Sequence, residues 1–319
     1  MQIGFPVLFN YRRKEYVIHE KKSRTAATNL SLFLIALPGI LYLLINNYAP
    51  MLGIFLAFKN YSLMKGPFKS DWCGFDNFEF LFKTKDAWIM TRNTLLYNTA
   101  FIIIGTVAAI LVAILMCELG EKKRVKFYQA VMLLPNLLSW VVIGFIAYAF
   151  LNADTGFINN TFLRWLGLDP VAWYSTPGAW PIILVIVNLW KNVGYQSIIF
   201  MAAISGIDKS LFEAAAIDGC RPAGTFFKIV MPISKTVYAT VFILDFVAHW
   251  NDFMWPFLVM TGEDKRTIQL AVQSFFGTQP VHYSAIMAAL VISAIPMIIM
   301  FIFMQKYYVE GIASSGIKG

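Results

Sequence analysis

Two stripes of polar and ionisable side chains interrupt segments of the chain that are otherwise apolar. The first follows one helical face at i, i+3, i+4 and i+7 spacing and consists of Asn188, Lys191, Asn192 and Tyr195. The second has i, i+4 and i+7 spacing and consists of Asp245, His249 and Asp252, with Trp250, Asn251 and Trp255 beside them. Amide, carboxylate, imidazole and phenol groups next to flat indole faces suit the binding of a hydroxyl-rich solute such as a sugar.

The charges in these stripes have two interpretations. Ionisable groups inside a membrane segment are costly, so by default they mark a pathway. Lys191 and His249 could together bind a carboxylate, which would indicate an acidic oligosaccharide such as a uronate polymer. Alternatively, Lys191 pairs with Asp245 or Asp252 and only locks two helices together. The sequence leaves both interpretations open.

The segments that carry the stripes are predicted to be transmembrane helices. Hydrophobic residues make up 58% of the chain and charged residues 14%, against about 25% charged in a soluble domain. Six apolar segments are long enough to cross a hydrocarbon core of about 30 Å, and they lie near residues 30–49, 93–116, 127–150, 180–204, 236–260 and 284–304. The predicted fold class is all-α, a polytopic membrane protein with six transmembrane helices over residues 30–304.

Lysine and arginine residues collect on one side of these predicted spans. They lie in the N-terminal arm 1–29, in the loop between the second and third spans, in the loop 205–235 and in the tail 305–319: Arg12, Arg13, Lys14, Lys21, Lys22, Arg24, Lys122, Lys123, Arg124, Lys126, Lys209, Arg221, Lys228, Lys235, Lys306 and Lys318. Positively charged short loops stay in the cytoplasm, so both termini and the loop 205–235 are predicted to be cytoplasmic.

The charge and the cysteines exclude other classes of partner. The net charge of +8 is explained by the basic residues that cluster at the ends of the predicted spans. Membrane lipid is therefore an expected partner, and nucleic acid is not. Cys73, Cys117 and Cys220 are scattered and form no CxxC pair. This arrangement predicts neither a metal site nor a disulfide framework.

The loop 205–235 contains a predicted short helix. Asp208 is a candidate N-cap, the residues from Glu213 to Ala216 are mostly strong helix formers, and Gly219 can take the left-handed conformation that ends a helix. An alanine-rich face buries too little apolar area to hold a helix on lipid, where Trp, Phe or Leu are preferred. Its small side chains instead let the surface of another protein approach closely. Glu213 and Asp218 lie at the edge of this contact face, where they can form charged contacts.

The two long outer loops, residues 50–92 and 151–179, are rich in aromatic residues. These are Trp72, Phe75, Phe78, Phe80, Phe82, Trp88, Trp165, Trp173 and Tyr174. Aromatic side chains commonly anchor a protein at the membrane interface. The alternative is that these loops form a docking surface for an extracellular partner.

Several motifs carry a resemblance to a known family. The run Glu213-Ala214-Ala215, followed by Asp218-Gly219 and later by Ile229 and Pro232, resembles the EAA signature of permease subunits in bacterial ABC importers. Residues 190–195 (WKNVGY), 202–208 (AAISGID), 48–53 and 57–61 are similar to permeases for oligo- and polysaccharides, of the maltose and alginate types. The C-terminal third, with residues 250–252 (WND) and 305–308 (QKYY), is more similar to the partner permease of such pairs.

This resemblance implies a type I ABC importer permease fold in the bacterial inner membrane. It implies a second permease subunit in a heterodimer, two ATP-binding cassette subunits and an extracytoplasmic sugar-binding protein. ATP and Mg²⁺ would bind to the ATPase subunits, while this chain, which has no GxxxxGK[ST] loop, would carry no cofactor and no catalytic residue. The loop 205–235 would present a coupling helix to the ATPases, with Glu213, Ala214, Ala215, Asp218, Gly219 and Pro232 as its contacts.

The resemblance also bears on the two polar stripes. Asn188, Lys191 and Asn192 fall where the related maltose-type permease contacts its sugar, and His249 and Asp252 fall where it uses asparagines. The stripes would therefore line the sugar pathway. Because the residue types differ at these positions, the specificity should differ too.

Two other classes of function fit the sequence less well. An ion-coupled secondary sugar transporter would use Lys191, Asp245 and Asp252 as a proton relay, but the coupling-like loop and the lack of an obvious inverted repeat argue against it. An intramembrane enzyme would need a nucleophile–base or metal constellation. None is visible in the sequence, because His19, His249 and His282 lie in separate segments.

Overall fold

Helices dominate the computed structural model, which describes residues 22–83, 85–120, 122–260, 266–277 and 281–316. The chain divides into two units, residues 1–53 and residues 54–319, and each is described separately. Part of the predicted basic arm, including Arg12, Arg13, Lys14 and Lys21, lies outside the described residues, as does Lys318 of the tail.

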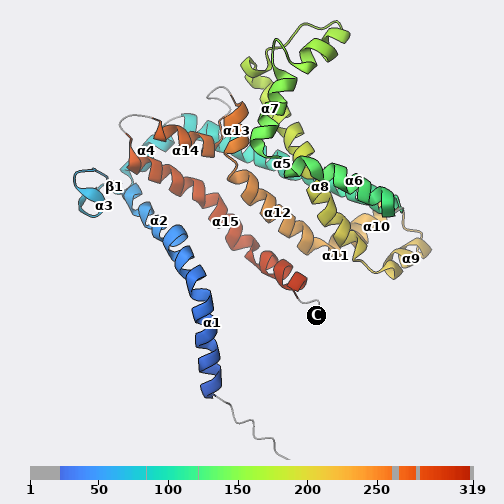
Figure 1. The fold of residues 1–319 in the computed structure, drawn as a ribbon, viewed down its shortest axis with the longest axis horizontal. Helices are drawn as coiled ribbons and strands as arrows, with labels where there is room; N and C mark the ends of the chain where they lie inside the picture. Colours follow the sequence, from blue (N-terminus) through green and yellow to red (C-terminus); the bar gives the residue numbers. More distant parts are fainter. Residues whose placement is uncertain (1–21, 84, 121, 261–265, 278–280, 317–319) are drawn as a thin grey trace, which may run out of the picture. The chain divides into compact units, whose positions relative to one another are not determined.

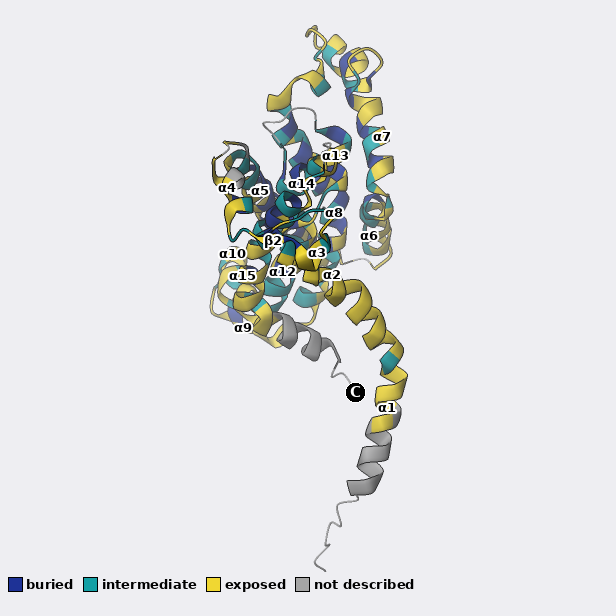
Figure 2. Cartoon of the chain, turned by 90° about the vertical axis from the view of Figure 1, so that its left-hand side faces the viewer, coloured by how far each residue is buried: buried dark blue, intermediate teal, exposed yellow. Residues whose placement is uncertain are grey.

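The described part of the first unit, from residue 22 onward, is a nearly continuous helix. α1 (Lys22–Leu43) passes through a π-helical turn, η1 (Leu44–Tyr48), into α2 (Ala49–Met51) and the start of η2 (Leu52–Phe58). The described side chains of α1 are mostly exposed, as Figure 2 shows in yellow. A helix that is apolar on every face and not covered by protein is suited to lipid.

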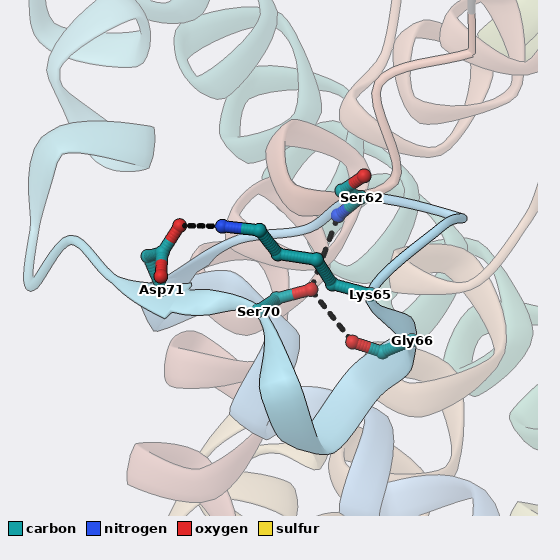
Figure 3. Close-up of polar contacts among 5 residues, drawn as sticks. All are labelled: Ser62, Lys65, Gly66, Ser70 and Asp71. Atoms are coloured by element: carbon teal, nitrogen blue, oxygen red, sulfur yellow. Dashed lines mark hydrogen bonds and ion pairs between the residues drawn. The ribbon is translucent and has the colours of Figure 1, made fainter.

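The second unit begins with a small subdomain. It comprises β1 (Lys59–Asn60), α3 (Gly66–Lys69), β2 (Asp71–Trp72) and α4 (Asp76–Lys83), and β1 pairs antiparallel with β2. The Ser70 hydroxyl donates to the Gly66 carbonyl at 2.6 Å and accepts from the Ser62 amide at 3.1 Å (Figure 3). The Lys65 ammonium lies 2.5 Å from the Asp71 carboxylate, and this hydrogen bond lowers the pKa of Asp71 below its ordinary value.

The outer aromatic residues divide into buried and exposed sets. Phe78 is buried beside Ala57 and Ala288, and the Phe58 ring stacks on Trp72 with 5.8 Å between ring centroids. Of the aromatic residues singled out in the sequence, Trp72, Phe75, Phe82, Trp88 and Trp165 are exposed, and Trp173 and Tyr174 are half-buried. The side chain of Phe80 lies outside the described residues. Two roles therefore stay possible for the exposed aromatic residues: anchoring at the membrane interface and docking of an extracellular partner.

Long helices form the membrane part of the second unit. They are α5 (Lys85–Glu118), α6 (Lys122–Leu137), α7 (Trp140–Leu151), α8 (Trp180–Ser205), α12 (Lys235–Trp250) and α15 (Tyr283–Gly316). α8 packs against both α5 and α6, and α12 packs along α15 (Figure 1). α8 is therefore the central element, and it carries the first polar stripe.

Shorter elements connect these helices. Between α7 and α8 they are η3 (Ile158–Leu163), η4 (Trp173–Ser175) and η5 (Pro177–Ala179). Between α8 and α12 they are α9 (Lys209–Ile217), α10 (Pro222–Thr225), η6 (Phe226–Val230) and α11 (Met231–Ile233), and after α12 they are α13 (Met254–Val259) and α14 (Ile268–Phe276).

Two of the predicted spans are interrupted. Within the described residues, four helices are long and apolar enough to cross a membrane, namely Leu32–Phe58, Ala87–Glu118, Pro177–Ser205 and Tyr283–Tyr307. The predicted span 127–150 instead consists of α6 and α7, whose axes are bent by 95°. Pro135 lacks an amide hydrogen, and Ser139 caps the N-terminus of α7 by accepting from the Val142 amide at 3.3 Å.

The other interrupted span is 236–260. α12 ends at Trp250, and the Asp252 carboxylate accepts a hydrogen bond from the Trp255 amide at 3.3 Å where α13 begins. A second bend, of 74°, separates the segment Pro222–Ile233 from α12. If each bent pair crosses the membrane once, the chain has up to six spans, so the count of six stays a prediction.

Among the described residues, the largest buried cluster lies where α5, α7, α8 and α13 meet. It includes the fully buried side chains of Trp180, Leu184, Ile143 and Trp255. A second cluster joins α5, α8 and α12 through Ala109, Ala113, Phe200 and Val241. Small alanine side chains let α5 approach α8 closely, as is typical of packed membrane helices.

Candidate functional site

The predicted helix of the loop 205–235 is present as α9. The Asp208 carboxylate accepts a hydrogen bond from the Ser210 amide at 3.0 Å, as an N-cap does. At the other end Gly219 has φ +71°, in the left-handed region that favours glycine. The Gly219 and Cys220 amides donate to the carbonyls of Ala216 and Ala215 at 3.1 and 2.9 Å. Both ends of α9 are therefore fixed by its own sequence.

The two faces of α9 differ in exposure. Ala215 is buried against the rest of the unit, while Glu213, Ala214, Asp218 and Gly219 are exposed. Ile217 is 86% exposed on the same short helix. Pro232 lies exposed in α11, further along the loop. Of the predicted coupling residues, Ala215 thus anchors the helix and the others remain open to a partner.

A cavity lies on the inner side of α9. Its volume is about 420 Å³, and it is lined by Ile114, Cys117, Glu118, Ile204, Phe212, Ala216, Cys220, Pro222, Thr225, Phe226 and Val230. These residues come from α5, α8, α9 and α10 and their connections, so the cavity separates α9 from the long helices.

We expect the N-cap of α9 to be required for its order. Replacing Asp208 with alanine removes the acceptor of the Ser210 amide, and hydrogen exchange at the first amides of α9 should accelerate; Asp208→Ser should preserve protection, because serine caps as well. The hydrogen bond to the Ser210 amide lowers the pKa of Asp208 below its ordinary 3.8. The carboxylate cap is therefore fully present at any pH above the ordinary pKa of 3.8, and it is lost only as the pH falls through the lowered pKa. Equal exchange in both variants would contradict this role.

His249 joins the two polar stripes. Its Nδ1 lies 2.7 Å from the Asp245 carbonyl oxygen, which can only accept, so Nδ1 carries the proton. Nε2 then accepts from the Asn188 side-chain amide at 2.9 Å. A further link between α8 and α12 comes from Gln196, whose amide donates to the Asp245 carboxylate at 2.7 Å. These contacts lock α8 to α12.

Lys191 forms neither of the two contacts predicted for it with an acid. In the part of the chain that the structure describes, it takes part in no ion pair with Asp245 or Asp252. Its ammonium group instead donates to backbone carbonyls at the junction between α6 and α7. The Asp252 carboxylate is used to cap α13.

The remaining predicted pathway residues are dispersed. Asn192 accepts a hydrogen bond from the Asn136 side chain at 3.3 Å, and Tyr195 is 49% exposed. Asn251 is exposed at the end of α12. Trp250 is buried and donates to the Ser293 carbonyl at 2.9 Å. Trp255 is buried and stacks on Trp140, with 5.3 Å between ring centroids. The structure thus brings Asn188, His249 and Asp245 together and leaves Tyr195 and Asn251 open.

Sequence reasoning missed two polar residues of this network. Gln196 is buried and bonds to Asp245, and Asn136 bonds to Asn192. The spacing held a signal for Gln196, since Asn188, Asn192 and Gln196 follow at i, i+4 and i+8. Asn136 gave no such signal, because it stands alone in an apolar run.

Comparison with known proteins supplies relatives. The family described as "Binding-protein-dependent transport system inner membrane component" matches residues 105–314. "Protein LplB" of Bacillus subtilis (strain 168) is 30% identical over 237 residues, which cover 74% of this chain and 74% of that protein. "Polygalacturonan/rhamnogalacturonan transport system permease protein YteP" of the same organism is 30% identical over 213 residues, covering 67% of this chain and 66% of that protein.

A solved structure resembles the whole fold. It is the crystal structure of a bacterial ABC transporter involved in the import of the acidic polysaccharide alginate. The TM-score to one of its chains is 0.78, with 27% identity, covering 90% of this chain and 98% of that chain. A second crystal structure of the alginate ABC transporter, in complex with an alginate pentasaccharide-bound periplasmic protein, matches with the same TM-score of 0.78.

Proposed function

The chain belongs to the family of binding-protein-dependent transport system inner membrane components, and on that premise we propose that it forms, with a second permease, the pathway of an ATP-driven importer of oligo- or polysaccharides. The observation that carries this proposal is the likeness in fold to a permease chain of the alginate importer over 90% of this chain. The chain is a transport subunit and not an enzyme. An ion-coupled secondary transporter gains no support from these relatives.

α9 acts as the coupling helix in this proposal. This short capped helix and its C-terminal end expose Glu213, Ala214, Asp218 and Gly219. The small side chains would let the wall of an ATPase cleft approach closely, and the two carboxylates would form charged contacts at the edge of that cleft. The ATPase subunits would bind ATP and Mg²⁺ and would move α9 as a rigid body. The cavity on its inner side gives that movement room.

The substrate is proposed from the relatives and from the polar network. Glycans with acidic groups are the first class to test, because one relative is named for polygalacturonan and the solved structures import alginate. Tyr195 and Asn251 are the predicted pathway residues that stay exposed in this conformation. Both termini and α9 would lie in the cytoplasm, and an extracytoplasmic sugar-binding protein would deliver the glycan at the opposite side.

Purification from the native membrane tests this function. We expect an affinity tag on the tail to co-purify a second permease and an ATPase, identified by mass spectrometry. In proteoliposomes with the cognate binding protein, an oligogalacturonate should stimulate ATP hydrolysis and accumulate, and a neutral malto-oligosaccharide serves as comparison. Uptake driven by a proton gradient without ATP would overturn the ABC assignment. Stimulation by the neutral sugar alone would overturn only the preference for acidic glycans.

A further inference from the structure

The break between α6 and α7 leaves backbone carbonyls without helical partners. α6 ends at Leu137 and α7 begins at Trp140, with the two axes bent by 95°. The last carbonyls of a helix have no amide four residues further on. Inside a membrane such groups need a partner within the protein, since no water is available and each orphan is costly.

Lys191 from the centre of α8 supplies that partner. Its ammonium nitrogen donates to the carbonyl of Leu138 at 2.5 Å and to that of Asn136 at 3.1 Å, and it lies 3.4 Å from the Pro135 carbonyl. The residue is only 7% exposed. The same nitrogen lies over the Trp140 ring, 5.0 Å from its centroid, which is favourable for a cation. One side chain thus contacts the last turn of α6 and the first residue of α7.

Neighbouring residues hold α8 close enough for this contact. Gly194 lies directly against the backbone of Met132 in α6, with no space for a side chain. Asn192 accepts from Asn136 at 3.3 Å. Trp140, beneath the ammonium group, stacks in turn on the buried Trp255. The ammonium group is therefore fixed on several sides, and its hydrogen bonds are directed to carbonyls and not to an open cavity.

We propose that Lys191 is a positioning residue for transport: a tethered cation that holds the third span in its broken form and so sets the shape of the pathway. This proposal rests on the proposed function for its link to transport, whereas its structural part does not. Discontinuous helices commonly form the substrate region of transporters. Lys191 then acts on the rate of the transport cycle through α6 and α7, and not by binding a carboxylate of the substrate.

A distance measurement tests the structural part without any substrate. Spin labels would be placed at Tyr128 in α6 and Phe145 in α7, which are 43% and 71% exposed, in full-length protein whose native cysteines are replaced by serine. From the helical rise, the backbone separation is about 18 Å at the observed bend and about 26 Å in a straight helix. Lys191→Met should broaden the distribution toward the longer value, and Lys191→Gln should do so less, because glutamine retains donors.

Lys126→Met is the matched control, since Lys126 is an exposed lysine on α6, the helix that carries the first spin label. Its distribution should equal that of the parent protein. An unchanged distribution in Lys191→Met would overturn the proposal. If both Lys191 variants fail to fold while Lys126→Met folds, Lys191 is a folding determinant, and the role in transport is also overturned.

Transport kinetics test the link to function. In the reconstituted complex, Lys191→Met should lower kcat by on the order of tenfold, as expected for the loss of charged hydrogen bonds, while KM changes less than twofold. The loss should be equal for any acidic and neutral oligosaccharides that are carried. A selective rise in KM for the acidic oligosaccharide would show that Lys191 binds substrate, against the proposal. If neither oligosaccharide is carried, the proposed function fails, while the distance measurement still decides the structural part.

Discussion

Glu213→Lys is expected to abolish ATP-driven transport while leaving the subunit in the membrane. Glu213 is exposed on α9 and lies away from its two caps, so the substitution should not unfold the helix. If the carboxylate meets a basic group of the ATPase, reversing its charge places like charges together, which costs several kcal/mol in an interface. Transport and substrate-stimulated ATP hydrolysis, measured in proteoliposomes, should fall by at least tenfold, with unchanged expression and unchanged thermal unfolding.

A matched pair of glycines in the same loop serves as the control for backbone effects. Gly219 has φ +71° and Gly224 does not, and a Cβ would meet open space at both. Gly219→Ala should therefore disturb the end of α9 by about 1 kcal/mol and weaken coupling, and Gly224→Ala should leave coupling intact. If coupling is equal in Glu213→Lys, Gly219→Ala and the unmodified protein, the proposed role of α9 in coupling to the ATPases is contradicted.

The helix α9 could be predicted from the sequence because its signals are local. Asp208 provides the N-cap and Gly219 the left-handed end, and each acts within a few residues of its position. The apolar lengths of the long helices are also local. The class of fold therefore followed from composition and spacing alone, and the family match agrees with it.

The role of Lys191 could not be predicted because it depends on another helix. Spacing placed Lys191 on one face of α8 but gave no information on which element that face would meet. Its partners, the carbonyls of Asn136 and Leu138, are backbone groups that become available only because α6 and α7 are bent. No pairing of side-chain types in the sequence encodes such a contact, so the predicted partners were the acids of the second polar stripe, Asp245 and Asp252.

The buried tryptophans illustrate the same limit. Trp250 and Trp255 suited a sugar pathway by residue type, yet both are fully buried in the structure. The Trp250 indole donates to Ser293 of α15, and Trp255 stacks on Trp140. Aromatic residues beside a polar stripe indicate a buried neighbourhood, but only the packing of α12 and α15 decides which ring faces a pathway and which faces protein. Their part in the pathway remains a prediction.

Gly194→Ala is expected to be the most destabilising single-methyl change in the described part of the membrane helices. A Cβ at Gly194 would overlap the Met132 carbonyl, and because that atom is backbone, α6 would have to move away from α8. Overpacking of this kind costs about 1–3 kcal/mol, and the displacement would also draw the α6–α7 break away from the Lys191 ammonium. Thermal unfolding of the purified complex should shift down, and transport should fall in parallel.

Gly105 offers the matched control for this change. It also lies in a membrane helix facing α8, but a Cβ there would meet only the Gln196 side-chain oxygen at 3.4 Å, close to an ordinary contact. Gly105→Ala should therefore unfold at nearly the temperature of the unmodified protein, or slightly above it, since alanine favours a helix over glycine by about 1 kcal/mol. If Gly194→Ala behaves like Gly105→Ala, α6 and α8 are not in direct backbone contact. The proposed role of Lys191 in holding the break between α6 and α7 then loses its geometric basis.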